Sequence, residues 1–139
     1  MKTIDNLNFK NLRALVRVDF NVPLDKKMQI TDDTRMRAAI PTIKKILSDG
    51  GSVVLMSHRG RPDGNNPAFS LKNLTPTLSQ MLSTKVLFAE DCINEKTKLT
   101  AKKLKPGQVL MLENIRYYKE EVEGCVAFAK ELSSLGDVY

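Results

Sequence analysis

The only histidine of the chain lies in a short cationic stretch, Ser57-His58-Arg59-Gly60-Arg61-Pro62. This stretch directly follows the most hydrophobic run of the sequence, residues 53–56, a pattern that is typical of a buried strand ending in a binding loop. Gly60 lets the backbone turn tightly, and Pro62 prevents a helix from forming across the two arginines. A stiff frame that carries cations in this way favours an anion as its ligand.

Polar groups also follow two other predicted strands, at residues 13–20 and 108–112. In an open parallel sheet the ligand site lies outside the carboxyl ends of the strands. The groups expected to converge there are Asp19, Asn21, His58, Arg59, Arg61, Glu113, Asn114 and Arg116. Together they predict a pocket for a small molecule that carries phosphate and carboxylate groups, with hydroxyls that donate to the aspartate.

Each of these residues also has a structural interpretation when it is taken alone. Arg17 and Asp19 lie two apart on the first strand and could form a structural ion pair. His58 could be a satisfied structural histidine, and Glu113 could belong to a turn at the end of a strand. Arg35 either is solvated or reaches the carboxyl edge of the sheet from the first turn of its helix.

Strands and helices alternate along the chain, which predicts an α/β fold with a mostly parallel sheet and helices on both faces, in three layers. The strands are expected at 13–20, 52–57, 85–89 and 108–112. The helices are expected after the cap cluster at 31–33 up to Gly50, from Pro76 past Leu82, at 93–104, and at about 120–135. Thr75 is predicted to cap the second of these helices. Pro41 should kink or divide the first helix, because it removes a backbone donor. Residues 137–139 resemble the start of another strand.

The composition is that of one ordinary globular domain, with 139 residues, 42% hydrophobic and 27% charged. No apolar run approaches the roughly 20 residues that span a bilayer, so a cytoplasmic protein without a membrane partner is expected. Cys92 and Cys125 lack a metal-ligand spacing and are expected to be reduced, partly buried thiols. Nucleotide-cradling glycine loops and clusters of metal-ligand residues are both missing from the sequence.

The net charge of +6 leaves an alternative open, a basic α/β module that binds nucleic acid or another polyanion. Most of the excess charge is lysine, scattered singly or in pairs such as Lys102-Lys103, where a solvated surface is the usual explanation. The arginines instead lie near strand ends, which favours a small anion and argues against a nucleic-acid partner.

Four motifs carry a resemblance to a known family. They are Val16-Arg17-Val18-Asp19-Phe20-Asn21-Val22-Pro23, Asp33-Thr34-Arg35-Met36-Arg37, Ser57-His58-Arg59-Gly60-Arg61-Pro62 and Leu112-Glu113-Asn114-Ile115-Arg116-Tyr117. In this order and at this spacing they resemble the phosphoglycerate kinase family, from about residue 9 to residue 139. The resemblance implies a Rossmann-like N-terminal lobe of a two-lobed glycolytic enzyme.

The implied activity is that of a phosphotransferase with a carboxyl group as acceptor, which moves a phosphoryl group between 1,3-bisphosphoglycerate and ADP and gives 3-phosphoglycerate and ATP. The substrate-binding residues that the resemblance implies are Asp19, Phe20, Asn21, Arg35, His58, Arg61 and Arg116. Asp19 and Asn21 would hold the hydroxyl and carboxyl end of the glycerate. The phosphate that is not transferred would be held by His58, Arg61 and Arg116. Arg35, implied as catalytic, would lie near the transferring phosphoryl group. Arg59 is given no role.

The resemblance also implies how the chain relates to the whole enzyme. Residues 1–139 would be part of the N-terminal phosphoglycerate-binding domain, with the C-terminal nucleotide-binding domain, and the Mg-ADP or Mg-ATP that it binds, absent. The chain is therefore expected to be a truncated fragment, inactive alone, of a full-length enzyme that is a monomer.

Overall fold

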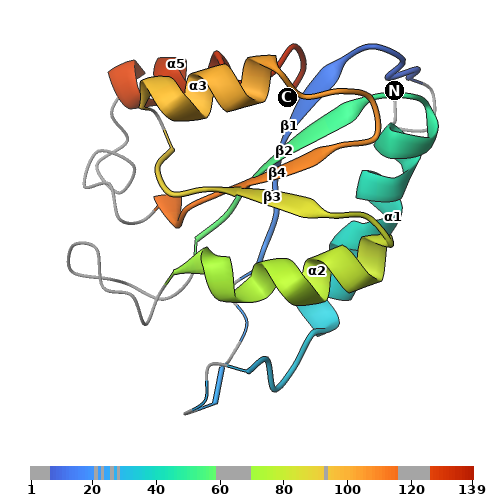
Figure 1. Ribbon diagram of the computed structural model, residues 1–139, viewed down its shortest axis with the longest axis vertical. Coiled ribbons are helices and arrows are strands. Elements are labelled where there is room, and N and C mark those ends of the chain that lie inside the picture. Colours follow the sequence, from blue (N-terminus) through green and yellow to red (C-terminus); the bar gives the residue numbers. More distant parts are fainter. Residues whose placement is uncertain are drawn as a thin grey trace.

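A four-stranded parallel sheet lies between two layers of helices (Figure 1). The strands are β1 (Arg13–Arg17), β2 (Ser52–Met56), β3 (Val86–Ala89) and β4 (Val109–Leu112), in the spatial order β1-β2-β4-β3. This computed structural model describes residues 7–20, 22, 24, 25, 27, 29–58, 70–92, 94–115 and 126–139, with the backbone alone at 126–128. The α/β class and the parallel sheet predicted from the sequence are confirmed.

Helices cover both faces of the sheet, as the predicted three-layer fold requires. Figure 1 shows α1 (Thr34–Ser48) and α2 (Thr75–Leu82) on one side and α3 (Glu95–Lys102) and α5 (Val126–Ser133) on the other. Crossover connections between parallel strands place helices on the faces in this way. No helix in the described part of the chain is long and apolar enough to cross a membrane.

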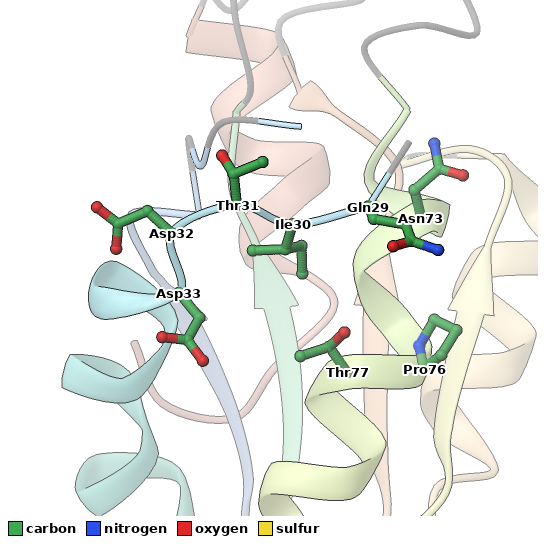
Figure 2. A pocket seen from close by; sticks show the side chains of 8 residues that line it. All are labelled: Gln29, Ile30, Thr31, Asp32, Asp33, Asn73, Pro76 and Thr77. Carbon is green, nitrogen blue, oxygen red and sulfur yellow. The ribbon is translucent and has the colours of Figure 1, made fainter. Parts of the chain in front are cut away.

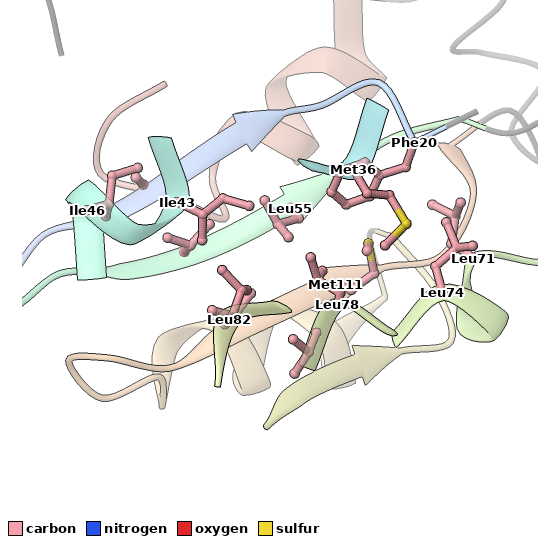
Figure 3. Close-up of a cluster of buried hydrophobic side chains, with 14 of the residues drawn as sticks. Phe20, Met36, Ile43, Ile46, Leu55, Leu71, Leu74, Leu78, Leu82 and Met111 are labelled. Carbon is pink, nitrogen blue, oxygen red and sulfur yellow. The ribbon is translucent and has the colours of Figure 1, made fainter. Parts of the chain in front are cut away.

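The core has two halves, one on each face of the sheet, and Figure 3 shows the half that α1 and α2 cover. The two-residue period of β1 separates them, since Ala14 and Val16 pack in the first half and Leu15 in the second. The central strands β2 and β4 are buried at every position, which accounts for their continuous apolar sequences.

Helix α1 follows the predicted apolar pattern and buries Met36, Ile43 and Ile46. It is one continuous helix from Thr34 to Ser48, so the alternative that Pro41 divides it in two is wrong. The burial of side chains on both sides of the proline holds the helix together across the missing donor.

Several elements are shorter than predicted, among them β2 and α3, and two of the boundary differences have a clear structural reason. β1 ends at Arg17 instead of Phe20, because its partner β2 ends at the paired residue Met56. A 3₁₀ helix, η3 (Leu71–Leu74), precedes α2, so Thr75 is the first residue of α2 and not its cap.

The residues after α5 return to β1, on the edge that faces away from β2. Ala14 and Val138 form an isolated parallel bridge, and the amide of Leu15 donates to the carbonyl of Val138 at 2.8 Å. The guanidinium of Arg13 also donates to the carbonyls of Ala101 at 2.8 Å and Leu135 at 2.6 Å, which joins β1 to the ends of two helices. The predicted strand-like pairing at 137–139 is thus present as a single bridge.

Candidate functional site

Asp19 and Arg35 meet just beyond the carboxyl end of β1. The Arg35 guanidinium lies 3.5 Å from the Asp19 carboxylate, and the side chains are 53% and 62% exposed. Such an exposed pair contributes little to stability. Arg35 is also the second residue of α1, where the helix dipole disfavours a cation by about 0.3–1 kcal/mol. The pair therefore leaves both charged groups accessible to solvent at this edge of the sheet.

The segment that carries His58 is joined to the end of β1. Ser57 is fully buried, and its hydroxyl accepts a hydrogen bond from the amide of Phe20 at 2.9 Å. Asp19 precedes Phe20 and His58 follows Ser57, so this bond brings the two candidate residues to one edge of the sheet. His58 itself is partly exposed, as a ligand-binding group must be.

Phe20 has a different position from the other candidates. Its side chain is fully buried in the core between the sheet and α1, and its amide is bonded to Ser57. The carbonyl of Phe20 accepts from the amide of Val22 at 2.8 Å. Any contact between Phe20 and a substrate is therefore limited to its backbone.

Three of the seven candidates, Asn21, Arg61 and Arg116, lie outside the described residues, as does Arg59. Described neighbours exist for Asn21 and Arg116 but not for Arg61. Phe20 and Ile115 are both bonded to Ser57, and Ile115 immediately precedes Arg116. The segments that lead to two of these three residues, Asn21 and Arg116, thus start from the same edge of the sheet.

Glu113 has a role that the sequence did not reveal. Its carboxylate accepts hydrogen bonds from the Ser70 hydroxyl at 2.7 Å, the Leu71 amide at 2.9 Å and the Asn114 amide at 2.8 Å. These bonds join the end of β4 to the start of η3. The signal in the sequence was an acid directly after an apolar strand, but only the fold shows that two of its partners, Ser70 and Leu71, lie more than forty residues away.

A pocket of about 710 Å³ lies near this edge, between the loop before α1 and the start of α2 (Figure 2). It contains none of the candidate residues. Its two acids already have partners, because Asp32 accepts from the hydroxyl and amide of Thr34, which lower its pKa, and Asp33 pairs with Arg37 at 3.0 Å. Among the described residues, no group of three or more His, Cys, Asp or Glu could hold a metal ion.

Cys92 is a fully buried thiol, where partial burial was predicted, and Cys125 lies outside the described residues. The Cys92 thiol donates to the carbonyl of Glu113 at 3.0 Å. Burial, and to a lesser extent the charges of Asp91 and Glu113, raise the pKa of the thiol well above its usual value. Cys92 therefore stays protonated and is unsuited to be a nucleophile.

Comparison with known proteins shows the family and supports the fold. The family model for phosphoglycerate kinase matches residues 4–139. The chain is 56% identical over 119 residues to phosphoglycerate kinase of Porphyromonas gingivalis, covering 86% of the chain and 28% of the relative. It is 50% identical over 137 residues to the cytosolic enzyme of Triticum aestivum, covering 99% of the chain and 34% of the relative.

A crystal structure of phosphoglycerate kinase from Pyrococcus horikoshii OT3 superimposes with a TM-score of 0.87 at 32% identity, over 99% of this chain and 36% of that one. The structure of the Coxiella burnetii enzyme gives a TM-score of 0.82 at 35% identity, over 95% and 32% of the two chains. The chain thus spans about a third of the length of the relatives that it matches. It belongs to the phosphoglycerate kinase family.

Proposed function

We propose that residues 1–139 form part of the phosphoglycerate-binding lobe of a phosphoglycerate kinase. The whole protein would transfer a phosphoryl group reversibly from 1,3-bisphosphoglycerate to ADP, giving 3-phosphoglycerate and ATP, and so act as a phosphotransferase with a carboxyl group as acceptor. The observation that carries the proposal is the exposed pair of Asp19 and Arg35, beside the bond that joins the segments of Asp19 and His58. Family membership supports it.

The chemistry of these groups matches the two ends of phosphoglycerate. The Asp19 carboxylate is an acceptor for the glycerate hydroxyl, with Asn21 beside it in the sequence. His58, Arg61 and Arg116 would hold the phosphate that is not transferred, through charged hydrogen bonds. A ligand of this kind would span the ends of β1, β2 and β4.

Arg35 is the proposed catalytic residue. In phosphoryl transfer, negative charge spreads over the equatorial oxygens of the moving group, and a fixed guanidinium stabilises that charge. The 3.5 Å contact with Asp19 would hold the Arg35 side chain near the hydroxyl and carboxyl end of the substrate. That is the end at which the acyl phosphate forms and breaks.

The nucleotide is assigned to a second lobe outside these residues. The magnesium ion that accompanies ADP or ATP does not fit the described part of this chain, where no acidic cluster could hold a metal, so no step here involves it. Closure of two lobes would exclude water and align the substrates. The whole enzyme would be a monomer located in the cytoplasm. The cytosolic relative in Triticum aestivum supports the cytoplasmic location.

A titration with 3-phosphoglycerate, followed by ¹H–¹⁵N NMR, tests the site. Signals of Asp19, Arg35 and His58 should shift first and saturate together. Shifts confined to the lysines near Lys102 would contradict the assignment, and tight binding of DNA with a steep salt dependence would favour the polyanion-binding alternative. Residues 1–139 alone should show no ATP formation in a coupled assay.

A further inference from the structure

We infer that Ser57 is a positioning residue, whose buried hydroxyl holds Asp19 in register with His58. This inference rests on the phosphoglycerate-binding function proposed above. It concerns a residue that touches no substrate and acts through the backbone of its neighbours.

The first part of the argument is the contact toward β1. Ser57 directly follows β2, which lies between β1 and β4 in the sheet. The backbone pairing of β1 with β2 ends with the amide of Val18, which donates to the carbonyl of Met56 at 3.0 Å. Two residues later, the amide of Phe20 donates to the side chain of Ser57 at 2.9 Å. A hydroxyl therefore continues the connection past the point where backbone pairing stops.

The second part is the contact toward β4. The backbone carbonyl of Ser57 accepts from the amide of Ile115 at 3.1 Å. The Ser57 hydroxyl also donates to the carbonyl of His58, the next residue, at 3.3 Å. Ser57 thus connects the ends of three strands, and of its two side-chain contacts only the one with Phe20 reaches another strand. A change of side chain would remove both of these contacts and leave the backbone bond to Ile115 in place, so the segment of His58 would stay joined to the end of β4.

Burial makes the hydroxyl difficult to replace. Ser57 is 0% exposed, so without its oxygen the amide of Phe20 would lack an acceptor inside the protein. The backbone of Phe20 would then shift to find water or another acceptor. Asp19 is bonded covalently to Phe20 and would move with it, relative to His58. Displacements of about 1 Å are enough to weaken a site that grips two ends of one ligand.

This asymmetry predicts different effects on two probes. By the proposed function, 3-phosphoglycerate would contact both Asp19 and His58, whereas inorganic phosphate would contact His58 without Asp19. Loss of the Ser57 hydroxyl should therefore weaken the binding of 3-phosphoglycerate and spare the binding of phosphate. A residue with a merely structural role would affect both ligands equally or neither.

The experiment measures the dissociation constants of both probes by calorimetry, in the native protein that contains this chain. Ser57→Ala is compared with the wild type and with Ser79→Ala. Ser79 is a matched control, because its hydroxyl accepts from the Val86 amide at 3.0 Å, at the start of β3 and away from the site. For Ser57→Ala we expect Kd for 3-phosphoglycerate to rise about tenfold, or about 1.4 kcal/mol, with Kd for phosphate within about twofold. Ser79→Ala should leave both values within about twofold.

A second measurement needs no variant and stands even if Ser57→Ala does not fold. In the wild type, saturating 3-phosphoglycerate should slow hydrogen exchange of the Phe20 amide about tenfold, and saturating phosphate should not. Equal protection by the two ligands, or equal weakening of both in Ser57→Ala, would overturn the role of Ser57. A wild type that binds phosphate but shows no preference for 3-phosphoglycerate would instead overturn the proposed function, and the inference with it.

Discussion

Removing the carboxylate of Glu113 should destabilise the protein far more than removing an exposed acid. In Glu113→Ala, the Leu71 and Asn114 amides and the Ser70 hydroxyl lose an acceptor at 2.7–2.9 Å. A hydrogen bond to a charged group contributes about 1.5–3 kcal/mol, and the partial exposure of Glu113 lets water replace some of this. We expect the free energy of unfolding to fall by about 2–4 kcal/mol.

Glu113→Gln tests the geometry behind that value. One oxygen, Oε1, accepts from both amides, and glutamine keeps this oxygen. The new amide group would face the Ser70 hydroxyl, which can rotate and accept. The loss should therefore be about 1 kcal/mol, measured by urea unfolding with an unchanged slope, and the Leu71 amide should remain protected from exchange.

The control is Glu90→Ala, because Glu90 is exposed. It should change the free energy of unfolding by no more than about 0.5 kcal/mol. The reasoning is refuted if Glu113→Ala behaves like this control. It is also refuted if Glu113→Gln is as damaging as Glu113→Ala, since the negative charge would then matter and the two amide contacts would not.

Three further predictions concern stability and reactivity. The hydrogen bond from Lys45, and then that from the Phe9 amide, lower the pKa of Asp49. The contribution of Asp49 to stability is therefore fully present above its unfolded pKa of about 3.8 and is lost as the pH falls through the lower folded pKa. Asp49→Asn should make the free energy of unfolding depend less on pH in this acidic range, and an unchanged pH dependence would contradict this. Cys92 should react with a thiol reagent only as fast as the protein unfolds, and rapid labelling at Cys92 in the native protein would show that this thiol is not buried. Gly51→Ala would place a methyl group 2.8 Å from the carbonyl oxygen of Phe9. This should lower the free energy of unfolding by about 1–3 kcal/mol, measured by thermal unfolding. An unchanged Tm would show that the backbone relaxes freely.

Regular elements were predictable because their signals are local. The alternation in β1 correctly separated Ala14 and Val16 from Leu15, and the spacing of Met36, Ile43 and Ile46 identified the buried face of α1. Each pattern reflects the repeat of a single strand or helix, which the sequence carries directly.

The remaining features depend on partners that are distant in sequence. The alternation of β1 continues to Phe20, but the strand ends where β2 does, and no local pattern contains that limit. The bonds of Ser57 to Phe20 and of Glu113 to Leu71 likewise exist only because parallel strands bring separate segments to one edge. In the site, the sequence supplied the candidate residues, while the pairing of Asp19 with Arg35 came from the fold.

The bridge between β1 and Val138 has a consequence for the order of folding. Arg13 and Asp137 are in contact although 124 residues separate them. A ribosome that adds about 5–20 residues per second needs on the order of 6–25 s to cover that distance. During this time the edge of β1 that faces away from β2 lacks its bridge to Val138 and is open to other chains. Within the described residues, β1 is thus made early and bridged on that edge late, and newly made chains should be most prone to aggregate in that interval.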